Sequence, residues 1–232
     1  MHKRLVLIFH GIGGRHAAAG ADEESYWCSE ARFLSILDAI PHVSAQMQIP
    51  IEITFDDGNA SDETIAAPAL HKRGLKATFF ICAGRIGKRG YLDGPQLRSL
   101  AQGGMAIGSH GWDHLDWRTL TEKDTFEREV FQARTVIEDT VAAGAITAVA
   151  IPFGSYDRPV LAAVGQAFSQ IYTSDGGLAS GVGAAIPREC YTTAWDTDTL
   201  RTLASPRPWM HTLRRHLAVA YKRRRGPPQL AA

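Results

Sequence analysis

Two adjacent carboxylates, Asp56 and Asp57, follow a short segment of alternating apolar and polar residues. The alternation over 51–55 (IEITF) is the period of a β-strand, and Gly58 permits a sharp turn directly after the carboxylates. Two anions this close repel each other unless a cation lies between or beside them. Because Asp-Gly is also a common turn dipeptide, the segment alone indicates a metal site and an ordinary turn equally well.

A second segment supplies two imidazoles four residues apart, His110 and His114, with a third carboxylate at Asp113. On one helical turn this spacing aims both rings at a common point. A carboxylate with two histidines leaves open coordination positions and suits a catalytic zinc or another divalent metal. A lone histidine pair is more often a surface feature, but together with the Asp56-Asp57 pair it favours a metal centre.

Three segments resemble the first three motifs of the polysaccharide deacetylases, carbohydrate esterase family 4, whose domain is also called the NodB homology domain. They are TFDDG at 54–58, SHGWDH at 109–114 and IPFGSY at 151–156. The resemblance covers about residues 4–190, most of the chain. It implies an α/β fold, a distorted (β/α)7-type barrel in a single domain, and metal-dependent removal of an N-acetyl group from a sugar.

The resemblance also implies roles for individual residues. Asp57, His110 and His114 would hold the metal, which is expected to be zinc, with cobalt, nickel or iron as alternatives. Asp56 would act as the general base on a water molecule. The backbone amide of Phe153 would help to stabilise the oxyanion.

The general acid is expected to be a histidine. His10 stands at the end of the apolar run 5–9, which reads as the first buried strand. The poly-N-acetylglucosamine deacetylase branch, whose motif order is circularly permuted, has a similar aromatic-His pair there, and in that branch this histidine takes the place of the acid. His10 is therefore the preferred acid and His211 the reserve, while a histidine that only caps a strand is the alternative for His10.

Two positions depart from the family pattern. Most members have an arginine at the head of the third motif, where it orients the base, but Ala150 stands there in this chain. Arg188 could reach Asp56 from a later strand and supply the missing contact. The fourth motif has no clear match, and Asp175 and the segment 195–198 (WDTD) are only suggestive.

The composition fits one barrel-sized domain. The chain has 232 residues, and 45% of them are hydrophobic, enough for a sizeable core. We expect a catalytic domain at 1–213 and a basic C-terminal tail at 214–232. A net charge of +1 predicts no nucleic-acid partner. The six Arg or Lys without an acid in 214–225 predict a solvated, frayed helix, with weak contact to anionic lipid heads as the alternative.

The N-terminus resembles a secretory leader only superficially. Its apolar run of five residues at 5–9 is shorter than the roughly seven to fifteen that a leader needs. No apolar stretch approaches the roughly 18 residues of a membrane span. We therefore expect a cytoplasmic protein.

Hydrophobic periodicity predicts alternating strands and helices. A predicted capping box joins Thr121 and Asp124, and Trp112 and Trp117 are expected as buried wall residues. The basic residues Arg85, Lys88 and Arg89 are expected to face solvent, with contact to substrate as the second interpretation. Predicted helices are 29–40 (ended by Pro41), 62–72, 96–102, 121–143 and 157–168, and further strands are 77–82, 105–108, 145–151 and 171–174.

These expectations combine in one function. We predict a metal-dependent carbohydrate N-deacetylase, a hydrolase of a linear amide bond, with an acetylated amino sugar as its substrate. The expected location favours an intracellular precursor of a surface polysaccharide such as O-antigen. The alternatives are a degenerate sugar-binding protein without turnover and a deformylase or amidase that acts on a non-sugar amide.

Overall fold

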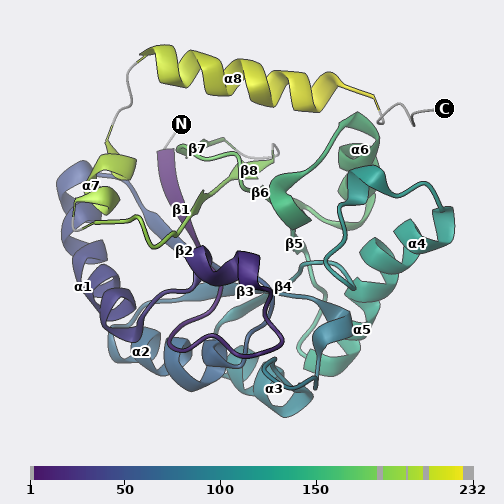
Figure 1. Cartoon of the computed structure of the whole chain (residues 1–232), viewed down its shortest axis with the longest axis horizontal. Helices are drawn as coiled ribbons and strands as arrows, with labels where there is room; N and C mark the ends of the chain where they lie inside the picture. The colour runs from purple at the N-terminus through teal and green to yellow at the C-terminus, as the bar shows by residue number, and fades with distance from the viewer. Residues whose placement is uncertain (1–2, 182–184, 197, 206–208, 227–232) are drawn as a thin grey trace.

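The computed structural model describes residues 3–181, 185–196, 198–205 and 209–226, and its centre is a ring of short strands (Figure 1). Neighbouring strands in the ring are hydrogen-bonded and parallel. A further short strand, β7 (Ala179–Ser180), pairs antiparallel with the start of β1. The ring consists in order of β1 (Lys3–Phe9), β2 (Ile51–Phe55), β3 (Ala77–Ile81), β4 (Ala106–Ser109), β5 (Ala148–Ala150), β6 (Gln170–Thr173) and β8 (Ile186–Pro187).

One extended segment closes the ring. Its first half, β8, pairs with the end of β6, and its second half, β9 (Glu189–Cys190), pairs with the middle of β1. Only Arg188 separates the two halves. The segment therefore joins the last strand of the ring to the first, and the predicted distorted (β/α) barrel is confirmed.

Helices surround the barrel on its outside (Figure 1). Because β1 is covered by helices outside and by other strands inside, its residues 5–9 form a continuous apolar run and are at most 1% exposed. No helix in the described part of the chain has the length and apolar character needed to span a bilayer. The helices are α1 (Glu30–Met47), α2 (Ala67–Lys72), α3 (Gly94–Gln102), α4 (Lys123–Glu127), α5 (Ala133–Val141), α6 (Arg158–Ala167), α7 (Thr199–Ala204) and α8 (Trp209–Arg224).

The core is divided by the barrel wall. Most buried apolar residues lie in one large cluster between the strands and the helices. A much smaller cluster, which includes Val6, Phe80 and Tyr172, lies apart from it. Along β1, Leu5, Leu7 and Phe9 belong to the large cluster and Val6 to the small one, as the two-residue period of a strand requires.

Two helix predictions need correction. The first helix does not end before Pro41 but continues to Met47, because Ile40 and Val43 on either side of the proline are buried and their packing outweighs the one lost hydrogen bond. The capping box predicted at Thr121 is absent, since Glu122 is the N-cap and its side chain makes no capping bond.

The predicted helix 121–143 consists of α4, a wider π-helical turn η5 (Arg128–Gln132) and α5. A π-helical turn inserts an extra residue and so rotates the residues that follow it. The boundary expected between residues 213 and 214 falls inside α8, which is continuous across it.

Candidate active site

Asp57, His110 and His114 bring three potential metal ligands together after the C-terminal ends of β2 and β4. Asp57 Oδ1 lies 3.8 Å from His114 Nε2 and 4.0 Å from His110 Nε2. His110 Nδ1 is 2.8 Å from the carbonyl oxygen of Ala150. Because a carbonyl oxygen can only accept, Nδ1 carries the proton and Nε2 presents its lone pair toward the carboxylate. One carboxylate and two imidazoles so arranged fit a divalent cation.

These ligands are held by unusual backbone conformations rather than by a helical turn. The spacing of His110 and His114 predicts one turn of helix, but the segment is a loop in which His114 has φ 60°. Asp57 and Phe153 also have positive φ, 79° and 57°. The other non-glycine residues with positive φ in the described chain, Gln48 and Ala142, are helix C-caps. The remaining strained positions are thus concentrated at the site, where strain commonly serves function.

Burial keeps both imidazoles neutral. It lowers the pKa of His114 to about 3, with a further contribution from the neighbouring His110. Burial also lowers the pKa of His110, against the opposing effect of Asp56 and Asp57. A histidine binds a metal in its neutral form, and burial favours that form in both residues at neutral pH.

Glu129, which the sequence reading missed, fixes the histidine loop. Its carboxylate accepts hydrogen bonds from the backbone N–H of Trp112 (3.2 Å) and Asp113 (2.8 Å) and from Trp117 Nε1 (3.2 Å). Glu129 and Trp117 are each only 1% exposed, so Trp117 is a buried wall residue as predicted, whereas Trp112 is only partly buried. Glu129 lies in the π-helical turn η5. Because this turn contains an extra residue, the position of Glu129 does not follow the regular period of an α-helix.

Arg188 pairs with Asp56 inside the barrel. Its guanidinium donates from Nη1 to Oδ1 (2.7 Å) and from Nη2 to Oδ2 (2.8 Å), and also to the hydroxyl of Thr54 (3.0 Å). Its guanidinium carbon lies 5.1 Å and 5.8 Å from the ring centroids of Phe80 and Tyr172, and the residue is 1% exposed. The contact expected to replace the arginine absent at residue 150 is therefore present. Burial is the largest single effect and opposes ionisation of Asp56, but the charge and hydrogen bonds of Arg188, together with His110 and His10, outweigh it and hold the pKa of this carboxyl well below its usual value.

His10 lies beside Cys190 on β9, a neighbour that the sequence did not predict. Its Nδ1 is 3.9 Å from Cys190 Sγ, and its ring centroid is 5.3 Å from that of Tyr26. Burial raises the pKa of the Cys190 thiol to about 12, so the thiol stays protonated. The side chain of the reserve candidate, His211, lies outside the described part of the structure.

One cavity of about 590 Å³ collects all the residues predicted for the site. Two residues that the sequence reading missed, Glu23 and Tyr26, line it from the loop between β1 and α1. Tyr26 and Phe153 are 37% and 64% exposed, so each offers an aromatic face to solvent. The predicted residues in the lining are His10, Asp56, Asp57, His110, His114, Phe153 and Arg188.

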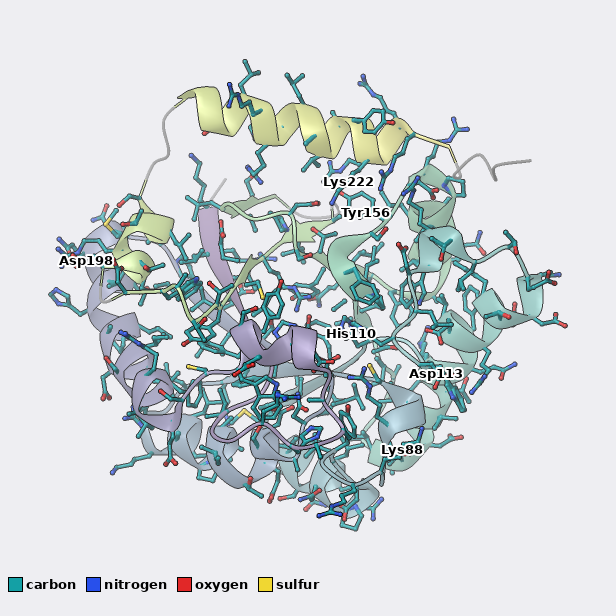
Figure 2. All side chains as sticks on the ribbon, in the orientation of Figure 1. Lys88, His110, Asp113, Tyr156, Asp198 and Lys222 are labelled. Atoms are coloured by element: carbon teal, nitrogen blue, oxygen red, sulfur yellow. The ribbon has the colours of Figure 1, made fainter. Side chains whose placement is uncertain are left out.

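The basic loop after β3 divides between the site and the surface. Arg85, expected to be solvated, turns inward, and its Nη1 lies 2.9 Å from Asp57 Oδ1. Its guanidinium also packs on the ring of Tyr91 at 5.0 Å. Lys88 is exposed at the periphery of the molecule, as expected (Figure 2). Arg85 therefore adds a cation to the carboxylate that faces both histidines.

The remaining candidate carboxylates lie outside the cavity lining. Asp113 pairs with Arg128 at 3.1 Å, and both side chains are at least 40% exposed. Asp175 accepts from Tyr156 Oη (2.6 Å) and pairs with Lys222. Figure 2 shows Asp198 far from His110, at the edge of the molecule. None of these three carboxylates lines the cavity, so the fourth motif still has no assigned residue.

The chain belongs to the polysaccharide deacetylase family, whose sequence profile matches residues 45–170, more than half of the chain. A Bacillus subtilis (strain 168) protein named as a polysaccharide deacetylase, YxkH, is 33% identical over 129 residues; the match spans 55% of this chain and 46% of YxkH. The chain therefore covers about half the length of this curated relative. Membership of the family supports carbohydrate deacetylation.

Solved structures of deacetylases have the same fold. The polysaccharide deacetylase BC0361 from Bacillus cereus is similar with a TM-score of 0.75 and 19% identity, over 88% of this chain and 69% of that one. IcaB from Ammonifex degensii is similar with a TM-score of 0.68 and 18% identity, over 89% and 98% of the two chains. At these identities the likeness establishes the barrel alone.

Proposed function

We propose that the protein is a metal-dependent hydrolase that removes the N-acetyl group from an amino sugar. The observation that carries this proposal is one cavity in which an Asp-His-His ligand set lies next to an arginine-paired carboxylate and a histidine. Hydrolysis of an amide needs a proton acceptor for water, stabilisation of the oxyanion and a proton donor for the leaving amine. The cavity contains a candidate for each of these tasks.

Asp57, His110 and His114 would hold the cation. When bound, a divalent metal there supplies Lewis-acid chemistry, lowering the pKa of a water molecule and polarising the amide carbonyl. Asp57 Oδ1 lies at most 4.0 Å from the Nε2 atoms of both histidines, so the three ligands are close enough to bind one ion. Zinc is our first expectation from the donor set, with cobalt, nickel and iron as competitors.

Asp56 would accept the proton of the attacking water. Its pairing with Arg188 keeps it ionised and fixes its plane, because the contact is bidentate. Oδ2 is the oxygen nearer the ligand set, since it lies 3.7 Å from His110 Nε2. The backbone amide of Phe153, in its left-handed conformation beside His114, would stabilise the oxyanion.

His10 would donate the proton to the departing amine. To act as the acid, His10 must be an imidazolium with a proton on each ring nitrogen. Its Nδ1–H then faces Cys190 Sγ (3.9 Å) as a weak acceptor, and Nε2 carries the proton that goes to the amine. No described residue bonds to Nε2, and His10 lines the cavity. Replacement of His10 by alanine without any change in rate would transfer the acid role to His211 or to water.

The test compares wild type with Asp56→Asn for metal content and for acetate release from acetylated amino sugars and their oligomers. The variant should keep its metal and still fold, although with lower stability because Arg188 loses its charge partner, and turnover should fall by about a hundredfold to ten-thousandfold because the proton acceptor is removed. Turnover like that of wild type in Asp56→Asn would reject the assignment of the base.

The same assays separate the competing functions. A wild-type protein that binds metal and acetylated sugars but releases no acetate would be a sugar-binding protein. Faster release from formylated or non-sugar amides would identify a deformylase or amidase that uses the same ligand set. Parallel assays of lipid-linked sugars, nucleotide-linked sugars and finished polymers would test the expectation, based on sequence alone, of an intracellular precursor.

A further inference from the structure

Helix α8 turns its charged side toward the barrel. Arg215 Nη1 donates to the carbonyl oxygen of Gly176 (2.9 Å), and Lys222 Nζ donates to the carbonyl oxygen of Gly154 (3.0 Å). Lys222 also pairs with Asp175 at 2.6 Å and lies beside Tyr156 beneath the helix (Figure 2). Contacts from the middle and the C-terminal turn of the helix therefore fix which side of it faces the protein.

The opposite side of α8 is apolar and open to solvent. Leu213, Leu217 and Tyr221 follow at intervals of four residues, which places them in one stripe along a helix. Their exposed fractions are 48%, 62% and 67%. A surface helix normally buries such a stripe, so α8 has inverted amphipathicity, and an exposed apolar stripe of this kind marks an interaction site.

Positive charge accompanies this stripe, and the helix itself carries no negative charge. Arg214, Arg223 and Arg224 are exposed, although Arg223 Nη2 also lies 3.5 Å from the carbonyl oxygen of Ala185, and the sequence 209–226 contains no Asp or Glu. Figure 1 shows α8 along the outer edge of the molecule, with no other element beyond it. A flat surface could therefore meet the whole helix.

We propose that α8 docks the protein on an anionic lipid surface, with the stripe Leu213, Leu217 and Tyr221 in the interface and the flanking arginines on the headgroups. An apolar face combined with cationic flanks is the pattern of helices that lie in the plane of a membrane. Anionic lipid attracts each arginine near its surface and complements the charge of α8. A second copy of the chain is disfavoured as the occupant, because two such helices face to face would bring only like charges together.

The experiment measures co-sedimentation of the full chain with vesicles of phosphatidylcholine that contain phosphatidylglycerol, and with vesicles of phosphatidylcholine alone. Wild type should bind the anionic vesicles in a salt-sensitive manner and the neutral vesicles far less. The variant Leu213→Ser/Leu217→Ser/Tyr221→Ser should bind at least about tenfold more weakly, since its apolar contact is lost. Circular dichroism and metal content check that this variant is folded.

Matched charge variants complete the test. Arg214→Gln/Arg223→Gln/Arg224→Gln should bind about tenfold more weakly or worse. The control Lys72→Gln/Lys88→Gln/Arg89→Gln removes as many exposed positive charges elsewhere and should bind like wild type.

Three outcomes would overturn the proposal. The first is no binding of wild type to anionic vesicles, and the second is an equal loss of binding in both charge variants. The third is a concentration-dependent dimer in sedimentation velocity that the serine variant abolishes, which would make a second copy the occupant.

Discussion

The two halves of the catalytic cavity are positioned by different means. The metal-binding half (Asp57, His110 and His114) stands on loops that directly follow β2 and β4 and is shaped by local backbone strain. The proton-handling half (Asp56, Arg188, His10 and Cys190) is assembled by side-chain contacts between residues 132 and 180 positions apart. The first half joins residues at most 57 positions apart on the loops after β2 and β4, whereas the second exists only when the barrel is closed.

This difference follows from the closing segment. Arg188 and Cys190 lie on the one stretch of chain that pairs with both β6 and β1. A variant in the metal-binding half should therefore change metal affinity with little effect on closure. A variant in the proton-handling half should affect stability and turnover together, because the same contacts close the barrel and position the base.

The largest effect is expected from His110→Ala. Removing one of three protein ligands should abolish stoichiometric metal binding and lower turnover by about a thousandfold or more. Elemental analysis of variant and wild type purified side by side measures the first effect. Full metal content in the variant would contradict the ligand set, whatever the activity.

A smaller effect on turnover and a larger one on stability are expected from Arg188→Met. The change leaves the buried Asp56 carboxylate unpaired, which should destabilise the fold by about 3–5 kcal/mol, while turnover should fall by about ten- to a hundredfold. Chemical denaturation measures the stability.

The double variant Asp56→Asn/Arg188→Met is the matched control for Arg188→Met, because it removes the uncompensated charge and should recover part of the lost stability. If Arg188→Met is as stable as wild type, Arg188 does not stabilise the closed barrel. Arg89→Lys, at an exposed position, should change neither quantity.

Glu129→Gln tests the metal-binding half with a milder change. The amide cannot accept all three hydrogen bonds that the carboxylate accepts from the loop 112–113 and Trp117. Metal affinity should fall by about tenfold, as is typical when a residue that supports the ligands is changed. A metal titration decides the outcome, and Glu127→Gln on the exposed side of the same helix should match wild type.

The same division explains what the sequence could predict. Asp57, His110 and His114 were identifiable because residue type and short spacing are visible along the chain, although the expected helical turn is a loop. Arg188 was predictable only as a replacement for an arginine absent at residue 150. Cys190 carried no signal, because its neighbour His10 is set by strand register.

Fold predictions failed where tertiary packing overrides local rules. The barrel and most of its strands follow from apolar runs and alternation. Pro41 should end a helix, but buried neighbours carry the helix through it. Glu129 is hidden by a π-helical turn that no regular periodicity describes.

Acid titration of the metal-free protein should separate the two halves by pH. His114 has a folded pKa of about 3 against about 6.5 when unfolded. As pH falls below about 6.5, His114 is therefore protonated in the unfolded state but not in the folded state. This difference should lower the free energy of unfolding by up to about 1.4 kcal/mol per pH unit. Asp56 has a lowered folded pKa, so its contribution is complete above the unfolded value of about 3.9 and is lost only below it.

Two variants test which residue causes the loss of stability in each pH range. Stability of the metal-free protein, measured by denaturation at successive pH values, should decline between about pH 6.5 and 4 in wild type and decline less in His114→Gln, which has no imidazole to titrate. Asp56→Asn should keep the decline in this window and lose the steeper one below about pH 4. If the stability of His114→Gln declines as steeply as that of wild type above about pH 4, other groups cause the decline. The two halves of the cavity would then not be distinguishable by their pH dependence.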